Sequence, residues 1–182
     1  MAKLCTDGEN IENLSEENLN IIAELEKQLE NERGEDQPES ILVRGALLQC
    51  SCGTHCRKLN LSMDYGVYVE NMENPKVHEK NCKVGDDKNI SYYGICKSSN
   101  PPTDVENICL EPYVWPDGTV ASDSNENGPQ CKPCILGQWF NPVEDEKIQD
   151  LDDCQTYQGI STGSFLVCKY GGIIIPRTSG QS

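Results

Sequence analysis

The segment GALLQCSCG at residues 45–53 recurs near the other end of the chain as GSFLVCKYG at residues 163–171. The two copies share one pattern: glycine, a small residue, an apolar residue, leucine, any residue, cysteine, two further residues and glycine. The alignment needs no gap and pairs Cys50 with Cys168. Two copies of one short unit this far apart predict a pseudo-symmetric fold whose ends return to the same place. Because each copy carries one thiol, that place is a candidate cysteine site.

Around the two copies, short apolar runs alternate with clusters of glycine, proline, asparagine and aspartate. The runs are ILVRGALLQC at 41–50, LNL at 59–61, YGVYVE at 65–70, NISYYGIC at 89–96 and FLVCKYGGIII at 165–175. Runs of this length between turn residues are typical of β-strands, so the sequence predicts a mainly β body with long irregular connections. Residues 98–130 are expected to form one long loop, with Tyr113 and Trp115 as anchors.

Residues 1–40 have a different composition, since twelve of them are Asp or Glu. Helical spacing connects Leu14, Asn18, Ile21, Ile22, Leu25 and Leu29. With Ser15 as a helix start, this pattern predicts one amphipathic helix over residues 15–33, followed by a linker at 34–40. The chain therefore divides into an acidic N-terminal extension (1–40) and a β domain (41–182). The narrow apolar stripe must dock on something, either its own domain or a partner.

The overall composition limits both the core and the partners. With 182 residues but only two Phe and two Trp, the chain has material for a modest core. Its formal net charge is −15 and its isoelectric point about 4.4. Such a chain repels phosphate backbones, which argues against nucleic-acid binding, and its charge favours basic partners.

No signal-peptide pattern precedes the β domain, and no apolar run approaches membrane-spanning length. We therefore expect synthesis in a reducing cytoplasm and no stable membrane insertion. In that compartment the eleven cysteines are expected to serve as metal ligands or free thiols rather than disulfides.

The clearest metal-binding spacing is Cys131-Lys-Pro-Cys134, because two thiolates two residues apart can reach one tetrahedral ion. Three interpretations are open: a structural metal site completed by Cys50, Cys96 or Cys168, a redox pair, or buried unligated thiols. The redox interpretation lacks the βαβ setting that such pairs usually have. His78 is expected to be an exposed surface histidine.

Catalytic patterns are sparse. The chain has two histidines, His55 and His78, and contains neither a P-loop nor a GxGxxG motif. The acidic run at 150–153 reads as a solvated turn. The sequence therefore predicts a protein that is not an enzyme, since no residue set supplies nucleophile, base and oxyanion site together.

Several motifs, taken in order, resemble those of the PAAR-like spike-tip proteins, a bacterial protein family. These proteins belong to contractile injection systems, which include extracellular phage-tail-like particles. The landmarks are RGALLQCSCG at 44–53, LNL at 59–61, KVGDDKNISYYGICKSSNPP at 83–102, CKPCILGQW at 131–139, FLVCKYGGII at 165–174 and SGQ at 179–181. The resemblance as a whole covers about Val43 to Gln181, nearly the whole β body. The family typically has cysteines at the positions of Cys50, Cys96, Cys131 and Cys168.

The resemblance implies a small cone-like β domain that caps a trimeric spike and carries or recruits effector or toxin cargo. The protein would be made in the bacterial cytoplasm, assembled into the particle and delivered outside the cell. In the related PAAR family, Cys and His bind a metal near the apex. Here the predicted ligands are Cys50, Cys96, Cys131, Cys134 and Cys168, holding about one structural zinc or iron ion per chain. The alternative is a free-standing cysteine-rich metal-binding adaptor whose helix recruits a toxin or a chaperone.

Overall fold

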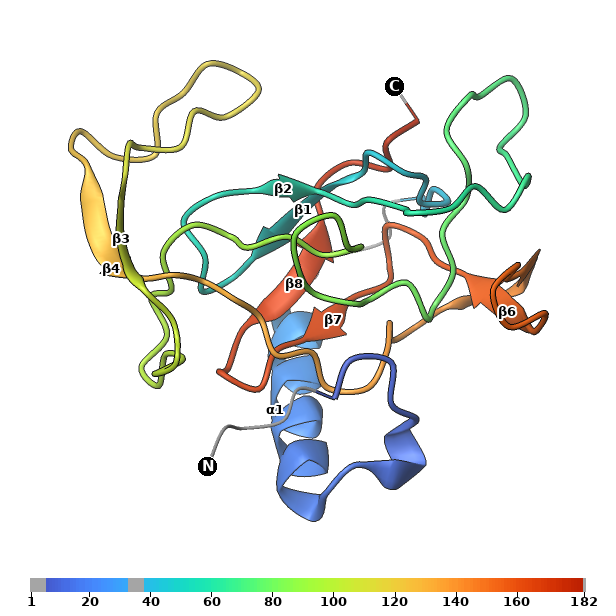
Figure 1. Ribbon diagram of the computed structural model, residues 1–182, viewed down its shortest axis with the longest axis horizontal. Helices are drawn as coiled ribbons and strands as arrows, with labels where there is room; N and C mark the ends of the chain where they lie inside the picture. Colours follow the sequence, from blue (N-terminus) through green and yellow to red (C-terminus); the bar gives the residue numbers. More distant parts are fainter. Residues whose placement is uncertain (1–5, 33–37, 182) are drawn as a thin grey trace.

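The computed structural model describes residues 6–32 and 38–181 (Figure 1). The elements run in the order η1 (Ile11–Asn13), α1 (Glu16–Glu32), β1 (Leu47–Cys50), β2 (Arg57–Lys58), β3 (Asn107–Leu110), β4 (Glu126–Pro129), β5 (Val143–Gln149), β6 (Thr156–Gly159), β7 (Leu166–Val167) and β8 (Ile173–Pro176). One N-terminal helix is followed by several small antiparallel sheets, which confirms the mainly β class predicted from the sequence.

A four-stranded antiparallel sheet with the order β2-β1-β8-β7 lies at the centre of the body. Strand β1 belongs to the first copy of the repeated unit and β7 to the second, and both pair with β8. Ile174 of β8 therefore faces Cys50 on one side and Leu166 on the other. The two copies do return to one place, where the β-branched run of β8 separates them.

Both copies end in the same tight turn. The Gly53 N–H donates to the Cys50 carbonyl at 3.0 Å, and the Gly171 N–H donates to the Cys168 carbonyl at the same distance. The glycines are required for different reasons. Gly171 has a φ of +89°, whereas a Cβ on Gly53 would lie 2.5 Å from the Cβ of Tyr93.

The remaining strands form two hairpins, β3–β4 and β5–β6. The expectation of one long loop over 98–130 is wrong, because this segment contains β3, β4 and a further bridge between Val114 and Val120. Strand β5 was not predicted either. Its sequence VEDEKIQ is largely exposed, so it lacks the apolar alternation that marks a half-buried strand. Three predicted runs, 59–61, 65–70 and 89–96, contain no named strand, although the last forms isolated bridges at Ile90, Ile95 and Cys96.

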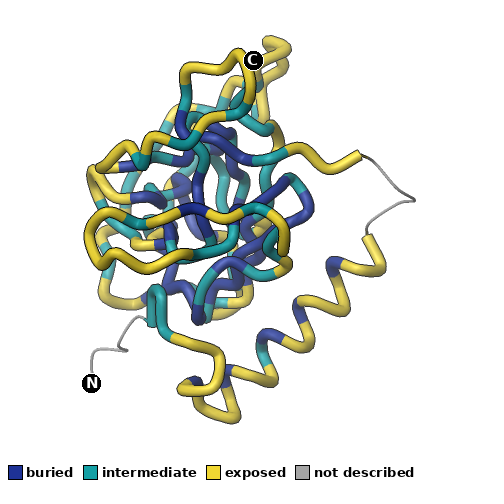
Figure 2. The backbone as a smooth tube through the Cα atoms, turned by 90° about the vertical axis from the view of Figure 1, so that its right-hand side faces the viewer, coloured by how far each residue is buried: buried dark blue, intermediate teal, exposed yellow. Residues whose placement is uncertain are grey.

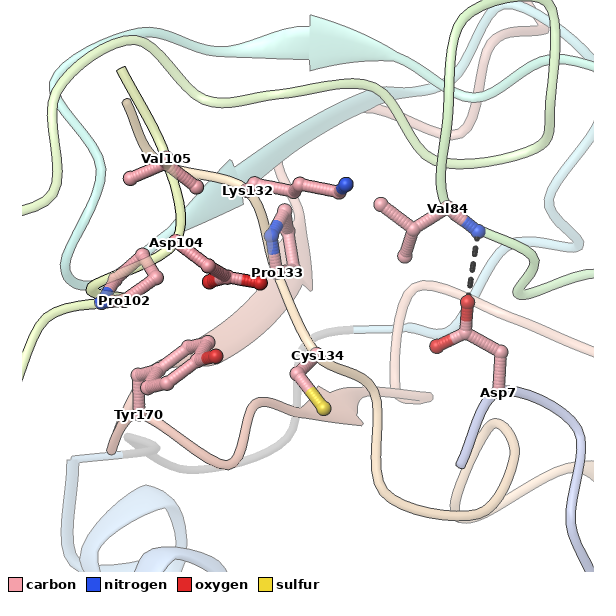
Figure 3. A pocket seen from close by; sticks show the side chains of 9 residues that line it. All are labelled: Asp7, Val84, Pro102, Asp104, Val105, Lys132, Pro133, Cys134 and Tyr170. Carbon is pink, nitrogen blue, oxygen red and sulfur yellow. Dashed lines mark hydrogen bonds between the residues drawn. The ribbon is translucent and has the colours of Figure 1, made fainter. Parts of the chain in front are cut away.

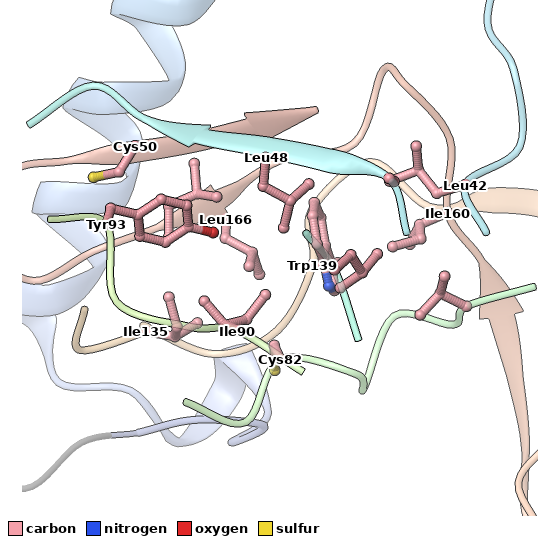
Figure 4. Packing of buried hydrophobic residues seen from close by; sticks show 14 of the residues in the cluster. Leu42, Leu48, Cys50, Cys82, Ile90, Tyr93, Ile135, Trp139, Ile160 and Leu166 are labelled. Atoms are coloured by element: carbon pink, nitrogen blue, oxygen red, sulfur yellow. The ribbon is translucent and has the colours of Figure 1, made fainter. Parts of the chain in front are cut away.

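The main core lies beneath the central sheet, where Trp139 and Tyr93 are the largest buried side chains (Figure 4). The Trp139 indole N–H donates to the Asn81 carbonyl at 2.9 Å, which satisfies its polar atom. Leu48 and Leu166, which occupy equivalent positions in the two repeated copies, both pack into this cluster. The repeated pattern thus sets the core as well as the strand pairing.

Helix α1 packs on its own β body, and its outer face is exposed (Figure 2). Buried Ile22, Leu25 and Leu29 belong to a second apolar cluster that also contains Phe165 and Val167. This answers the docking question left open by the sequence, because the apolar stripe is covered within the chain. The predicted helix end at residue 33 and most of the linker fall outside the described residues. In the described part of the chain, no helix is long and apolar enough to cross a membrane.

The segment before the helix is also tied to the β body. The Gly8 N–H donates to the Gly137 carbonyl at 2.6 Å, and the Asp7 carboxylate accepts from the N–H groups of Val84 and Ile135. Lys80 Nζ donates to the Gly8 carbonyl at 3.2 Å. The extension is thus built into the domain through backbone hydrogen bonds and through the helix.

Candidate functional site

Six cysteines gather where the repeated units meet the segments around 96 and 131–134. We call Cys50, Cys52, Cys96, Cys131, Cys134 and Cys168 the cysteine cluster. Five of them are buried and Cys52 is half-buried. Each of the ten cysteines in the described residues is a free thiol.

Two members of the cluster, Cys50 and Cys131, hydrogen-bond to each other through their thiols. The Cys131 thiol lowers the pKa of Cys50, although burial acts in the opposite direction, and the N–H groups of Cys52 and Gly53 add to the lowering. The same contact raises the pKa of Cys131, and burial raises it further. When this pair loses a proton, Cys50 therefore carries the charge and the Cys131 thiol donates to it.

Cys168 lies beside this pair in a different setting. Burial raises its pKa to about 12, and the Cys134 N–H donates to its Sγ at 3.4 Å. A Cβ on Gly172 would lie 2.9 Å from Cys50 Sγ, 3.6 Å from Cys52 Cβ and 3.7 Å from Cys168 Cβ. Three cysteines therefore approach one glycine, and the missing side chain of Gly172 leaves them room to do so.

Cys96 enters the cluster by backbone pairing. It forms an isolated bridge with Gly53 of the first repeated unit, and its N–H donates to the Pro129 carbonyl at 2.8 Å. A negative charge at Cys96 would raise the pKa of both Cys131 and Cys52. The five predicted ligands thus come from four separate parts of the chain and lie in one region.

The donor chemistry of this region suits zinc, which prefers thiolates in structural sites. Across residues 6–32 and 38–181, however, no three His, Cys, Asp or Glu side chains are grouped so that they could hold a metal ion. The cluster offers one hydrogen-bonded thiol pair with further thiols around it. A bound metal stays a prediction.

A small cavity of about 240 Å³ adjoins the cluster at Cys134 (Figure 3). Its wall also contains Lys132, Asp104 and Tyr170, with Val84 and Pro102 among the apolar residues. Cys134 thus belongs both to the cysteine cluster and to the wall of this cavity.

The expectation that His78 is exposed is wrong, since the residue is completely buried. Its ring lies between the rings of Tyr65 and Tyr157, with centroid separations of 4.9 and 5.0 Å. Nδ1 accepts from the Lys80 N–H at 3.2 Å, so Nε2 carries the proton and donates to Asp150 Oδ2 at 3.0 Å. Sequence reasoning missed this arrangement because the tyrosines and Asp150 are distant in the chain.

Burial lowers the pKa of His78, while the Asp150 carboxylate acts to raise it. A polar cavity of about 700 Å³ lies beside this histidine, between the N-terminal segment and the turn at 150–153. The cavity is lined by Tyr65, Tyr157 and Asp150 as well as by Lys80. Since the ring has hydrogen-bond partners at both nitrogens, its arrangement is that of a satisfied structural histidine.

The fold and the cluster define a small, mainly β, cysteine-rich domain with an N-terminal helix. Residues 42–181 match the family model described as "Domain of unknown function (DUF4280)", and the chain belongs to that family. No curated protein and no solved structure matches the chain.

Proposed function

We propose that this protein is the tip of a contractile injection system, where it caps the trimeric spike, sharpens it and carries or recruits effector or toxin cargo. In this role the protein is structural and not an enzyme. It is made in the bacterial cytoplasm and leaves the cell with the particle. Support for the proposal comes from the ordered landmarks between residues 44 and 181, which resemble the PAAR-like spike-tip family.

The observation that carries the proposal is that the last landmark, SGQ, is hydrogen-bonded to the segment that begins the β domain. The Val43 N–H donates to the Ser179 carbonyl at 3.0 Å, and Gln181 Nε2 donates to the Ile41 carbonyl at 2.6 Å. A Cβ on Gly180 would lie 2.5 Å from the Ala46 nitrogen. Each of the three residues thus has a physical task in closing the body on itself. A domain closed in this way resists opening from either end, as a protein driven through a membrane must.

A structural metal is part of the proposal. Cys50 and Cys131 would hold the ion together with Cys96, Cys134 or Cys168, and zinc is the expected metal, with iron second. The ion would cross-link parts of the chain that are far apart in sequence. Such a cross-link adds to stability when a core is small, because metal binding contributes to the free energy of folding.

The direct test is electron microscopy of assembled particles made with and without this chain. We expect the spike apex to lose a compact density when the gene is deleted, and we expect tagged protein to restore that density. If the apex is identical in both particles, the protein is not the tip.

The adaptor alternative assigns the recruiting role to the N-terminal helix. Because Ile22, Leu25 and Leu29 are packed against the β body, a partner would have to bind the acidic outer face of α1. Replacing exposed carboxylates of that face, with Glu24→Gln, Glu26→Gln and Glu30→Gln, would weaken binding of a toxin or chaperone if the adaptor alternative holds. The same variant would leave spike capping intact if the β body alone makes that contact.

A further inference from the structure

A β arm extends from the body between residues 106 and 130. Its base is the β3–β4 hairpin, and its outer part is a second hairpin around the bridge between Val114 and Val120. Figure 1 shows the arm reaching away from the central sheet on the opposite side from β6. An extended, ordered arm of this kind presents its side chains in a fixed geometry to whatever lies beside the domain.

The turn at the end of the arm fixes the conformation of the outer hairpin. The Gly118 N–H donates to the Trp115 carbonyl at 2.8 Å, and the Trp115 N–H donates to the Thr119 carbonyl at 2.8 Å. Gly118 has a φ of +85°, and the Asp117 side chain accepts from the Thr119 N–H. Pro116-Asp117-Gly118 is a favourable sequence for such a turn, since proline presets φ and glycine takes the left-handed position.

The two faces of the outer hairpin differ. Tyr113 and Trp115 share one face. The centroid of the Tyr113 ring lies 5.4 Å from that of His55 and 5.2 Å from that of Trp115. Because side chains alternate along a strand, Val114 and its bridge partner Val120 emerge together on the other face. Their exposed fractions are 58% and 55%. The aromatic face fixes the arm to the body, and the valine face is left for contact with another surface.

The charge on the arm is of one sign. Residues 106–130 contain no lysine, arginine or histidine, and they carry five acidic residues: Glu106, Glu111, Asp117, Asp123 and Glu126. A surface that meets the valine face would be brought close to these carboxylates, so lysine or arginine around an apolar contact would be favoured. A second copy of this chain would be repelled, because each carries a formal net charge of −15.

We propose that the arm binds the side of one spike chain, at an apolar pocket flanked by lysine or arginine side chains. The inference rests on the proposed function, in which this protein caps the trimeric spike, and it takes one copy of the protein per spike. One copy on a three-fold axis meets three identical faces and needs an off-axis contact to choose among them. The arm supplies that contact. Because its aromatic face already packs on the body, the arm loses less conformational entropy on binding.

The test uses the full-length protein and the purified trimeric spike of the same particle. The apolar variant combines Val114→Ser with Val120→Ser. Both side chains are more than half exposed, so the variant is expected to fold, which far-ultraviolet circular dichroism and a thermal melt check. We expect about tenfold weaker binding to the spike by calorimetry, since exposed residues at the centre of a contact dominate its energy.

The charge variant combines Glu106→Gln, Glu111→Gln and Asp123→Asn and leaves Asp117 in the turn. It should bind more slowly at low salt and show a weaker salt dependence. The matched control removes three charges from the exposed face of α1 with Glu24→Gln, Glu26→Gln and Glu30→Gln. The control should behave more like the wild-type protein than the charge variant does.

The outcomes separate the two proposals. If the wild-type protein does not bind the spike, both the proposed function and the role of the arm fail. If the wild-type protein binds and the apolar variant binds equally well, the role of the arm fails while spike capping stands. A photo-crosslinker at position 114 gives a second measure, because the inference requires it to join this chain to one spike chain per trimer.

Discussion

The two copies of the repeated unit share a strand partner and a turn hydrogen bond, but the pKa values of their thiols are shifted in opposite directions. Both end in a Cys-x-x-Gly turn with the same hydrogen bond, and both pair with β8. Yet the pKa of Cys50 is lowered by the Cys131 thiol, whereas burial raises the pKa of Cys168 to about 12. A sequence pattern can thus specify a local backbone without specifying the chemistry of the side chain that it carries, since neighbours from elsewhere in the fold decide that chemistry.

The largest expected effect tests whether both copies serve one metal site. In zinc-loaded protein, Cys50→Ala and Cys168→Ala should each remove the bound zinc and cost several kcal/mol of unfolding free energy. Cys109→Ala is the control, because Cys109 is exposed on β3. Elemental analysis and urea unfolding with and without a chelator are the measurements. A loss below about 1 kcal/mol for both variants would favour buried free thiols.

The next effect separates the two turn glycines. Gly53→Ala should cost about 3 kcal/mol, because the new Cβ would lie 2.5 Å from Tyr93 Cβ and 2.8 Å from the Tyr93 carbonyl oxygen. Gly171→Ala should cost about 1 kcal/mol, because it meets only the strain of a positive φ. Urea unfolding of the two variants gives the difference directly. If the two variants lose the same unfolding free energy, the close contact of Gly53 with Tyr93 does not distinguish the two turns.

Thiol reactivity should separate the copies without any substitution. In chelator-treated protein at pH 8, Cys50 should react with iodoacetamide about tenfold faster than Cys168, because its pKa is lowered and the thiolate is the nucleophile. Both thiols are buried, so access limits them similarly, and Cys109 serves as the exposed reference. Peptide mass spectrometry over a series of pH values measures each rate. The contrast between the copies is lost if Cys168 reacts as fast as Cys50.

The smallest expected effect is the change in unfolding free energy at acidic pH. We expect His78 to contribute to this change and the thiols not to contribute. Burial lowers the pKa of folded His78 below its usual value of 6.5. The unfolded chain then binds more protons, so stability is full above pH 6.5 and falls as the pH drops towards the folded pKa. This loss should be absent in His78→Gln, as urea unfolding over a series of pH values measures. An equal loss in that variant would assign the pH dependence to other groups.

Much of the fold follows from local patterns, and the exceptions have identifiable causes. A local sequence pattern predicts the strands of the repeated unit and of β8, and another predicts helix α1 from its apolar stripe. The outer hairpin also had one, since Pro116-Asp117-Gly118 stands between Val114 and Val120, but the polar residues around it concealed the strands. For β5, exposure on both faces removed the alternation on which strand prediction depends.

The candidate site was less predictable because its contacts are long-range. Spacing alone nominated Cys131 and Cys134 as partners, but the hydrogen-bonded pair is Cys50 and Cys131. Likewise, His78 has a lysine-rich sequence neighbourhood that suggests exposure. Its actual neighbours are Tyr157 and Asp150, which the β5–β6 hairpin brings to it. Which residues approach one another depends on the closed fold, and no local pattern encodes it.

The position of β8 has a consequence for biosynthesis. This strand is the central pairing partner of the sheet, yet the ribosome makes it near the end of the segment 41–181. Until β8 emerges, one edge of β1 is unpaired, and the bond between Gln181 and Ile41 joins residues 140 positions apart. The body therefore closes late and all at once, and the nascent chain carries open strand edges and unprotected thiols through most of its synthesis.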